Sequence, residues 1–296
     1  MEQFSAAGNG LVVRAPAKIN LSLLVAGRRA DGFHEIETLM AKVDLYDELL
    51  FERGEKDGIE LICRGPHWAP QGADNLVYRA CEALFEAAGA KMPVRVTLTK
   101  NVPAASGLGG ASSDAAAAML GLDRFAGMGA SAADIGEIAC RLGSDIAFFL
   151  GGPLAFCTGR GEKIREIEEK FSFRAILALP DVSVSTKRVY GNYEHDQVLY
   201  DRLSGRINGL IAKNKFDSVA AMCANMLEKS CLELHRELSE LKSHLEALGV
   251  GSVCLSGSGS AMFCMVAIAD RDTERYQSML RESFDCESLI VNSNRW

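Results

Sequence analysis

Residues 103–114 read Pro-Ala-Ala-Ser-Gly-Leu-Gly-Gly-Ala-Ser-Ser-Asp, and they lie between an alternating run, Val94–Lys100, and an alanine-rich segment. The alternation is typical of a strand with one buried face, and the alanines favour a helix that we expect to begin near Asp114. Glycine permits positive φ, so successive N–H groups can point into one concavity, and a helix N-terminus adds partial positive charge. A strand, a glycine loop and a helix capped by Ser112, Ser113 or Asp114 therefore predict a cradle for phosphate.

This loop does not match two familiar phosphate-binding motifs. The pattern G-x-x-x-x-G-K-[ST] requires a lysine, and there is none between Lys100 and Arg124. The pattern G-x-G-x-x-G fails because Gly107 and Gly109 are followed by Ser112. Tight packing alone also explains small residues in a loop, so both interpretations stay open for this stretch by itself.

Three further features lie outside this loop. The segment Ser256–Ser260 (SGSGS) would contact the same phosphates or form an ordinary hairpin turn. Lys18 lies in the segment APAKIN and would direct its charge at a phosphate or a reacting hydroxyl, although most lysines simply lie at the surface. Asp145 precedes the apolar run Ile146–Phe149, where it would serve as a general base or as a helix N-cap.

Aromatic and imidazole side chains form another candidate group. Phe33 and His34 follow a turn at Asp31, and Tyr190 lies far along the chain. Two aromatic rings can stack on the faces of a flat ligand while an imidazole hydrogen-bonds to its edge. The alternatives are a solvated histidine and a tyrosine on the exposed side of an amphipathic helix.

The composition excludes several classes of protein. The chain of 296 residues is 48% hydrophobic and 24% charged, a balance typical of globular proteins. Its net charge of −7 gives no sign of the basic face of duplex-binding proteins. The nine cysteines include no C-x-x-C pair, which argues against a zinc site and for reduced thiols. No signal peptide is evident, and no apolar run approaches the ~18 residues of a membrane helix. We expect a soluble, cytoplasmic protein that binds neither nucleic acid nor membrane.

The order of the segments predicts the fold class. Strands are expected at Leu11–Ala15, Ile19–Val25, Ile59–Cys63 and Arg174–Leu179, and helices at Asn75–Ala88 and Ser131–Leu142. Because strands and helices mix without strict alternation, we expect an α+β fold and not a doubly wound parallel sheet. The charged segment Gly159–Lys170 is the expected boundary between two halves.

Four motifs taken together resemble the GHMP small-molecule kinase superfamily: PAKIN at 16–20, PAASGLGGASSD at 103–114, LGSD at 142–145 and LSGSGS at 255–260. The segment ADGFHEIETLM at 30–40 is similar to those members that phosphorylate the 2-hydroxyl of a cytidine-diphosphate-linked methylerythritol, a precursor of isoprenoids. The resemblance spans about residues 11–291. It implies a two-domain α+β fold, with an ATP-binding half (1–158) like ribosomal protein S5 domain 2 and a ferredoxin-like half (159–296).

The resemblance also implies substrates and residue roles. ATP and a CDP-linked polyol would be the substrates, with Mg²⁺ as cofactor, in a monomer or weak homodimer. Asp145 would accept the proton of the hydroxyl, and Lys18 would orient that hydroxyl and stabilise developing charge. The residues that match the ATP site are Asn75, Lys100, Pro103, Ala104, Ala105, Ser106, Gly107, Leu108, Gly109, Gly110, Ala111, Ser112 and Ser113. Those that match the acceptor site are Asn20, Phe33, His34, Thr186, Tyr190, Gly257 and Ser258.

Within the acceptor site, Phe33 and Tyr190 would sandwich the cytosine and His34 would read its polar edge. Many family members carry tyrosine where this chain has Phe33, so stacking is retained without a hydroxyl contact. Three alternatives stay open. A GHMP kinase for homoserine, mevalonate or a sugar needs no aromatic clamp, an ATP-dependent decarboxylase needs an arginine for a carboxylate, and a nucleotide-binding or RNA-contacting module would bind without turnover.

Overall fold

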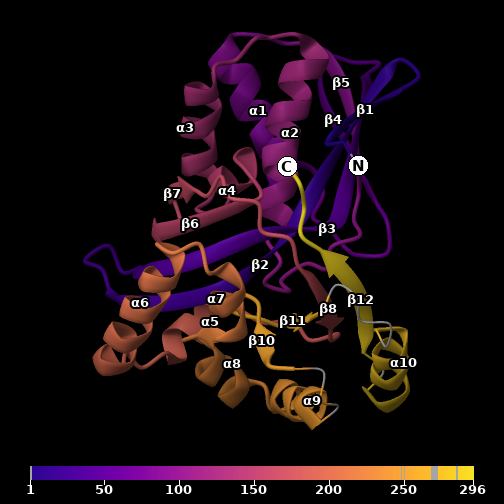
Figure 1. The fold of residues 1–296 in the computed structure, drawn as a ribbon. Coiled ribbons are helices and arrows are strands. Elements are labelled where there is room, and N and C mark those ends of the chain that lie inside the picture. The colour runs from indigo at the N-terminus through magenta and orange to yellow at the C-terminus, as the bar shows by residue number, and fades with distance from the viewer. Residues whose placement is uncertain (1, 248, 250, 268–272, 285) are drawn as a thin grey trace.

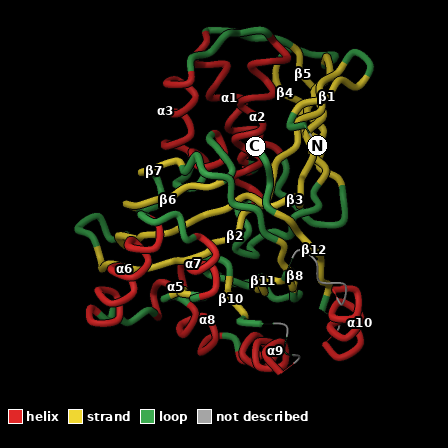
Figure 2. Tube along the Cα trace, viewed as in Figure 1, coloured by secondary structure: helices red, strands yellow, loops and turns green. Residues whose placement is uncertain are grey.

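The computed structural model describes residues 2–247, 249, 251–267, 273–284 and 286–296, and it contains two sheets (Figures 1 and 2). The strands of the larger sheet are β1 (Phe4–Ala7), β2 (Gly10–Arg28), β3 (His34–Arg53), β4 (Gly58–Arg64), β5 (Pro93–Thr99), β6 (Leu154–Gly159), β7 (Lys163–Glu166) and β9 (Ala224–Asn225). Its main order is β1-β2-β3-β5-β4, and β6 pairs with β3 and β7 while β9 pairs with β2. The pairs β4–β5 and β2–β9 are parallel, and the others are antiparallel.

The smaller sheet is antiparallel and has the order β10-β11-β8-β12. Its strands are β8 (Arg174–Leu179), β10 (Val253–Leu255), β11 (Met262–Val266) and β12 (Glu287–Asn292). The helices of the first half are α1 (Leu76–Ala88), α2 (Gly110–Ala126), α3 (Ala132–Leu142) and α4 (Ile146–Leu150). Those of the second half are α5 (Thr186–Asn192), α6 (Gln197–Ile211), α7 (Phe216–Ala221), α8 (Glu228–Leu234), α9 (Arg236–Ala247) and α10 (Thr273–Phe284). The α+β prediction is thereby confirmed.

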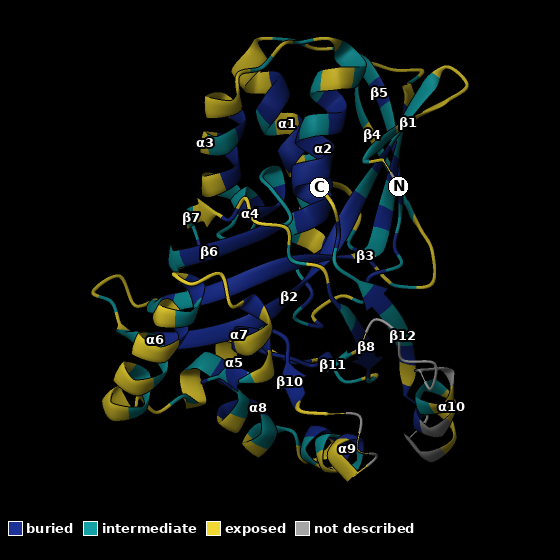
Figure 3. Ribbon diagram, in the orientation of Figure 1, coloured by how far each residue is buried: buried dark blue, intermediate teal, exposed yellow. Residues whose placement is uncertain are grey.

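Two hydrophobic cores hold these layers together. One core joins α1–α4 to the larger sheet, and its members all precede residue 160. The other joins the middle of β2 and β3 to the smaller sheet and to α6 and α7, and Figure 3 draws β2 as buried along most of its length. The end of the chain returns to the larger sheet, where the N–H of Asn294 donates to the carbonyl of Lys42 at 2.9 Å. The two halves are therefore packed through shared strands.

Strand β2 differs from the prediction of two short strands. The structure carries one strand through Pro16, with a register shift between Pro16 and Lys18 against β3. A proline breaks the ladder of a central strand, and a bulge accommodates it. The strand changes cores at this bulge: Val13 and Ala15 belong to the first core, whereas the apolar residues from Ala17 to Val25 belong to the second. Lys18 belongs to neither core.

Helix α2 begins at Gly110, four residues before the predicted start. Its N-cap is Gly109, which has a left-handed φ of +71°. Ser112 and Ser113 lie within the first turn, and Asp114 follows it. A Cβ on Gly109 would lie 2.8 Å from the Phe149 ring, so the close approach of another element selects glycine here. The prediction that Ser112, Ser113 or Asp114 caps this helix was wrong, because tertiary packing overrides the intrinsic capping preference of these residues.

Other predicted elements are confirmed. Asn75 caps α1 by accepting from the Val77 N–H at 2.8 Å, and Ser131 caps α3 by accepting from the Asp134 N–H. The nine cysteines are free thiols. Among the described residues, none of the helices has the length and apolar character needed to cross a membrane.

Candidate active site

A cavity of about 620 Å³ lies where β2 and β3, the glycine loop before α2, and the second half of the chain meet. The predicted residues in its lining are Lys18, Asn20, Asn75, Lys100, Pro103, Ala104, Ala105, Ser106, Gly107, Gly109, Gly110, Ala111, Ser112, Asp145, Thr186, Tyr190, Gly257 and Ser258. Four predicted residues lie outside the lining: Leu108, Ser113, Phe33 and His34. The fold therefore brings most of the candidate ATP residues and acceptor residues to one place.

The glycine loop is in direct contact with the loop Ser256–Ser260, which joins β10 and β11. A Cβ on Gly107 would lie 2.1 Å from the carbonyl oxygen of Ser256, so only glycine fits without a shift. The Ser256 hydroxyl donates to the Gly107 carbonyl at 3.0 Å, and the Ala261 N–H donates to the Ser106 carbonyl at 2.9 Å. The second loop is thus a hairpin connection that is fixed against the first loop.

Lys18 is buried beside both loops, and the β-bulge explains its position. The bulge frees the Lys18 N–H from the strand ladder, and this N–H donates to the Leu108 carbonyl at 2.9 Å. Its Nζ donates to Asn20 Oδ1 at 2.5 Å and to the Gly107 carbonyl at 2.6 Å. Burial lowers the pKa of Lys18, and the carboxylate of Asp145 opposes that shift. This lysine is a fixed part of the cavity wall and not a solvated surface residue.

Asn20 is oriented by a short chain of hydrogen bonds. Its Nδ2 donates to the hydroxyl of Thr38 at 2.8 Å, and that hydroxyl donates to the Ser22 carbonyl at 2.7 Å. The amide oxygen of Asn20 consequently points toward the Lys18 ammonium. Thr38 lines the cavity and was missed in the sequence, because an isolated threonine in a strand carries no local signal.

Asp145 immediately precedes α4 and lines the cavity. It occupies the N-cap position of α4, as its place in the sequence suggested, but its side chain makes no capping hydrogen bond with the helix. The carboxylate is close enough to Lys18 to influence its pKa, yet no ion pair within 4.0 Å joins the two. A substrate atom therefore has room to bind both groups.

The other end of α4 is held by a buried lysine that the sequence did not single out. Lys42 Nζ donates to the carbonyl of Phe149 at 3.2 Å and to that of Gly151 at 2.6 Å. A cation at a helix C-terminus complements the helix dipole. Burial lowers the pKa of Lys42 to about 8, a shift that the charge of Glu166 opposes.

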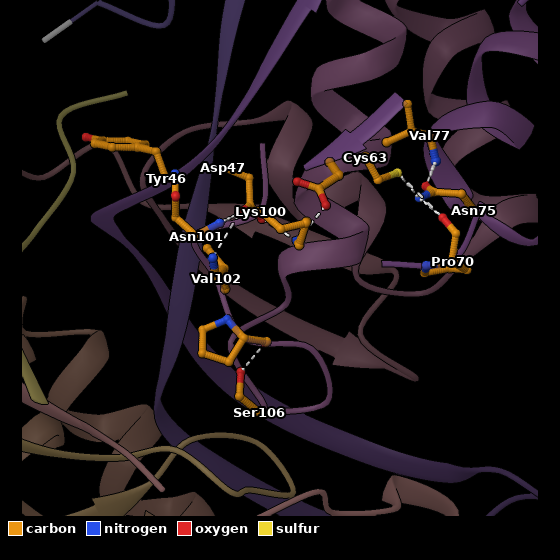
Figure 4. A network of polar contacts seen from close by, with 12 residues as sticks. Tyr46, Asp47, Cys63, Pro70, Asn75, Val77, Lys100, Asn101, Val102 and Ser106 are labelled. Atoms are coloured by element: carbon orange, nitrogen blue, oxygen red, sulfur yellow. Dashed lines mark hydrogen bonds and ion pairs between the residues drawn. The ribbon is translucent and has the colours of Figure 1, made fainter. Parts of the chain in front are cut away.

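Lys100 lines the cavity before the glycine loop and is bound by two carboxylates (Figure 4). Its Nζ donates to Asp47 and, at 2.7 Å, to Asp114. Burial opposes the charged form, but the two carboxylates outweigh it and raise the pKa of Lys100. Asp47 also accepts from the N–H groups of Asn101 and Val102, which fixes the chain just before the glycine loop. The two carboxylates already compensate the charge of Lys100. The contact of Lys100 with ATP stays a prediction.

The acceptor end of the cavity differs from the predicted aromatic sandwich. Tyr190 stacks on His34, with ring centroids 5.0 Å apart, while Phe33 is 53% exposed. The guanidinium of Arg160 lies 4.7 Å from the centre of the Phe33 ring. His34 thus stacks on the Tyr190 ring, and no ring contact joins Phe33 to Tyr190 among the described residues. The sandwich of a cytosine between Phe33 and Tyr190 stays a prediction. The hydroxyls of Thr186 and Ser258, which both line the cavity, form a hydrogen bond of 2.8 Å.

Arg160 and Trp68 also line the cavity, and neither was predicted. Arg160 lies between Gly159 and Gly161, which have φ values of +76° and +109°. An arginine flanked by glycines between two strands is a signal that the sequence did contain. Trp68 is 75% exposed, and its sequence context of proline and glycine indicated only a loop.

Oxygen atoms suited to Mg²⁺ occur near the start of α2. The hydroxyl of Ser113 and one carboxylate oxygen of Asp114 are buried without a hydrogen-bond partner. Mg²⁺ prefers oxygen ligands and is commonly bound by one or two protein groups together with substrate phosphates. In the part of the chain that the structure describes, no cluster of three or more His, Cys, Asp or Glu residues could hold a metal by itself. The donor set thus fits an ion that arrives with a nucleotide.

Comparison with known proteins identifies the family. The GHMP kinases N terminal domain matches residues 75–153, and the GHMP kinases C terminal domain matches residues 207–285. The 4-diphosphocytidyl-2-C-methyl-D-erythritol kinase of Bacillus cereus is 37% identical over 256 residues, which is 86% of this chain and 88% of that protein. The corresponding kinase of Bacillus anthracis is 36% identical over the same shares of both chains.

Solved structures agree with this assignment. A crystal structure of 4-(cytidine 5′-diphospho)-2C-methyl-D-erythritol kinase superposes with a TM-score of 0.74 at 30% identity, covering 96% of this chain and 99% of the other. Homoserine kinase from Cytophaga hutchinsonii has a TM-score of 0.73 at 19% identity over 100% and 98% of the two chains, which shows a shared fold. The chain therefore belongs to the 4-diphosphocytidyl-2-C-methyl-D-erythritol kinases of the GHMP kinase family and is an ATP-dependent kinase of isoprenoid precursor synthesis.

Proposed function

We propose that this kinase transfers the γ-phosphoryl group of ATP directly to the 2-hydroxyl of 4-diphosphocytidyl-2-C-methyl-D-erythritol. The observation that carries the proposal is the convergence of Lys18, Asp145 and the glycine loop on one cavity. Phosphoryl transfer depends mainly on positioning and electrostatic stabilisation, so a phosphate cradle, a base and a cation are sufficient protein machinery.

Asp145 is the proposed general base. Its carboxylate faces the cavity without a hydrogen bond to α4, so its lone pairs are available to the hydroxyl proton of the acceptor. A base positioned within hydrogen-bond reach of a reacting hydroxyl contributes about 10²- to 10⁴-fold in rate. After transfer, the proton would reside on the Asp145 carboxylate.

Lys18 is the proposed orienting residue. Two of its three ammonium protons are donated to Asn20 and Gly107, which leaves one N–H for the acceptor hydroxyl or a transferring oxygen. Because these partners fix the ammonium, its charge is already in place when negative charge develops. The Asp145 carboxylate supports the charged form against burial.

The glycine loop, with residues 103–113, would bind the phosphates of ATP. Its helix α2 begins at the loop and places N–H groups and the positive end of the helix dipole there. Ser113 and Asp114 would hold Mg²⁺ together with the phosphates, through the two buried oxygens that lack partners. When bound, the ion would neutralise charge on the β- and γ-phosphates. The base of ATP would bind near Asn75, and Trp68 lines the same cavity.

The cytidine end of the acceptor would bind at His34 and Tyr190. Burial and the charges of Arg28 and His195 lower the pKa of His34, so a neutral imidazole is available at pH 7 to donate or accept at the cytosine edge. Phe33 would reach the cytosine only if the bound ligand replaces the present contact between His34 and Tyr190. Asn20, Thr186, Gly257 and Ser258 would line the path between the base and the reacting hydroxyl.

A coupled assay of ADP release tests the proposal. The protein is supplied with ATP, Mg²⁺ and one acceptor at a time: the cytidylyl-methylerythritol compound, homoserine, mevalonate or galactose. We expect turnover only with the cytidine compound. Turnover confined to another acceptor would overturn the substrate, and ATP binding without turnover of any acceptor would overturn the proposed reaction.

A further inference from the structure

Arg160 occupies a position in the cavity that no role has yet explained. It lies in the turn between β6 and β7, is half-buried, and lines the same cavity as Lys18 and Asp145. Within the described residues, no carboxylate lies within 4.0 Å of its guanidinium, although it interacts electrostatically with Asp31 and Glu162. Arg29, in contrast, is paired with Asp31 and Glu35. A cation that lines a cavity without an ion pair is available to an anionic ligand.

The neighbours of Arg160 connect the two ends of the acceptor site. On one side, a Cβ on Gly161 would lie 3.4 Å from Asp145 Oδ1, so the backbone of this turn runs against the proposed base. On the other side, the Arg160 guanidinium lies over the ring of Phe33, which directly precedes His34. The turn therefore spans the distance from the reacting hydroxyl to the cytosine pocket.

The balance of charges in the cavity also indicates that Arg160 is available to an anionic ligand. Lys100 is neutralised by Asp47 and Asp114, and the proposed role of Lys18 directs its one remaining N–H at the reacting hydroxyl, not at the diphosphate. Asp145 adds a negative charge to the acceptor end. A diphosphate entering this end would meet a carboxylate in a partly buried site, which is unfavourable unless a further cation compensates. Arginine is suited to this task because its fork binds two phosphate oxygens at once.

We infer that Arg160 binds the diphosphate that links the cytidine and polyol parts of the acceptor, and thereby selects diphosphate-linked acceptors over uncharged ones. This inference rests on the proposed function, because it takes the ends of the acceptor to lie at Asp145 and at His34. The ring of Phe33 holds the guanidinium in place before the acceptor binds, through a cation–π contact.

The test compares the wild type with Arg160→Gln and Arg160→Lys. The matched control is Arg165→Gln, since Arg165 also lies over an aromatic ring, 5.3 Å from the centre of Phe156, but is absent from the cavity lining. Steady-state kinetics give the KM for acceptor and for ATP, and CDP and cytidine serve as competitive inhibitors against the acceptor. Thermal unfolding checks that each variant is folded.

For Arg160→Gln we expect the acceptor KM and the inhibition constant of CDP to rise about 10- to 100-fold, the range for a lost hydrogen bond to a charged group. The inhibition constant of cytidine and the KM for ATP should change by less than about twofold, and Arg160→Lys should fall between wild type and Arg160→Gln. Equal effects on CDP and cytidine, a rise in the ATP KM, or a change no larger than that of Arg165→Gln would each overturn the inference. Wild-type protein that neither phosphorylates the cytidine compound nor binds CDP would instead overturn the proposed function.

Discussion

The two ends of the cavity are built in different ways. The end proposed to bind phosphate comes from one continuous segment, the glycine loop and the start of α2. The Ser256 hydroxyl and the Ala261 N–H donate hydrogen bonds to its carbonyls and so fix it to the loop between β10 and β11. The end proposed to bind the acceptor is lined by side chains from separate elements: Arg160 after β6, Tyr190 on α5 and Ser258 after β10. His34, at the start of β3, stacks on Tyr190 behind this lining. A backbone site is complete before the ligand arrives, whereas a side-chain site depends on packing between distant segments.

Replacing the proposed base separates chemistry from binding and has the largest expected effect. We expect Asp145→Asn to lower kcat about 10²- to 10⁴-fold, because an amide cannot accept the hydroxyl proton. The dissociation constant of ATP, measured by calorimetry, should stay within about twofold, since Asp145 lies outside the glycine loop. Asp57→Asn, at an exposed position before β4, is the control. Near-normal turnover of Asp145→Asn would contradict its role.

A methyl group at Gly107 tests whether the stability of the protein depends on the close contact between Gly107 and the Ser256 backbone. Gly107 and Gly127 both have positive φ, +79° and +62°, but only Gly107 lies against another chain segment. We expect Gly107→Ala to reduce the free energy of unfolding by about 2–4 kcal/mol, of which about 1 kcal/mol is the backbone cost shared with Gly127→Ala. Urea unfolding of both variants measures the difference. Equal destabilisation would show that the contact with Ser256 is unimportant for stability.

Lys42, whose ammonium holds the end of α4, should make the stability of the protein depend on pH. The N–H and carbonyl groups that hold the glycine loop do not titrate in this range. Folded Lys42 has a pKa of about 8 against an ordinary value of 10.5. Between these pH values the unfolded chain binds a proton that the folded protein has lost, so the free energy of unfolding rises with pH. From pH 8 to 10.5, the free energy of unfolding of the wild type should rise by at most about 3 kcal/mol relative to that of Lys42→Met.

Urea unfolding at several pH values measures this gain, and the difference between the two proteins cancels groups that titrate in both. Lys163→Met, on the exposed part of β7, provides a control that removes a lysine charge from the surface. Parallel curves for the wild type and Lys42→Met would contradict the depressed pKa of Lys42.

The smallest effect is expected at the rim of the acceptor end. Phe33→Ala should raise the acceptor KM about two- to tenfold, the worth of one aromatic contact, and leave the ATP KM unchanged. Phe4→Ala is a matched control, because Phe4 also lies 4.7 Å from a guanidinium, that of Arg124, but far from the cavity lining. A larger effect for Phe33→Ala than for Tyr190→Ala would indicate that Phe33 swings onto the cytosine when the acceptor binds.

Sequence patterns predicted the local features well. The capped helix after Asn75, the helix after Ser131 and the strand after Gly58 follow from capping and periodicity, which act over a few residues. The start of α2 and the continuity of β2 were wrong because both depend on neighbours: Gly109 is selected by Phe149, and Pro16 is accommodated by a bulge against β3. Neither partner is visible from the local sequence.

The amino-acid sequence by itself determined the α+β class, because the order of strands and helices is a local pattern. It also predicted a phosphate loop from its glycine spacing, and the resemblance of four motifs to one family indicated Lys18 and Asp145 as the candidate pair. Only the tertiary structure decided that Tyr190 stacks on His34 and that Lys42 anchors α4. The same holds for Arg160, whose guanidinium reaches Phe33 from a turn more than a hundred residues along the chain. These contacts join residues far apart in sequence, and their geometry is set by the packing of both cores around β2 and β3.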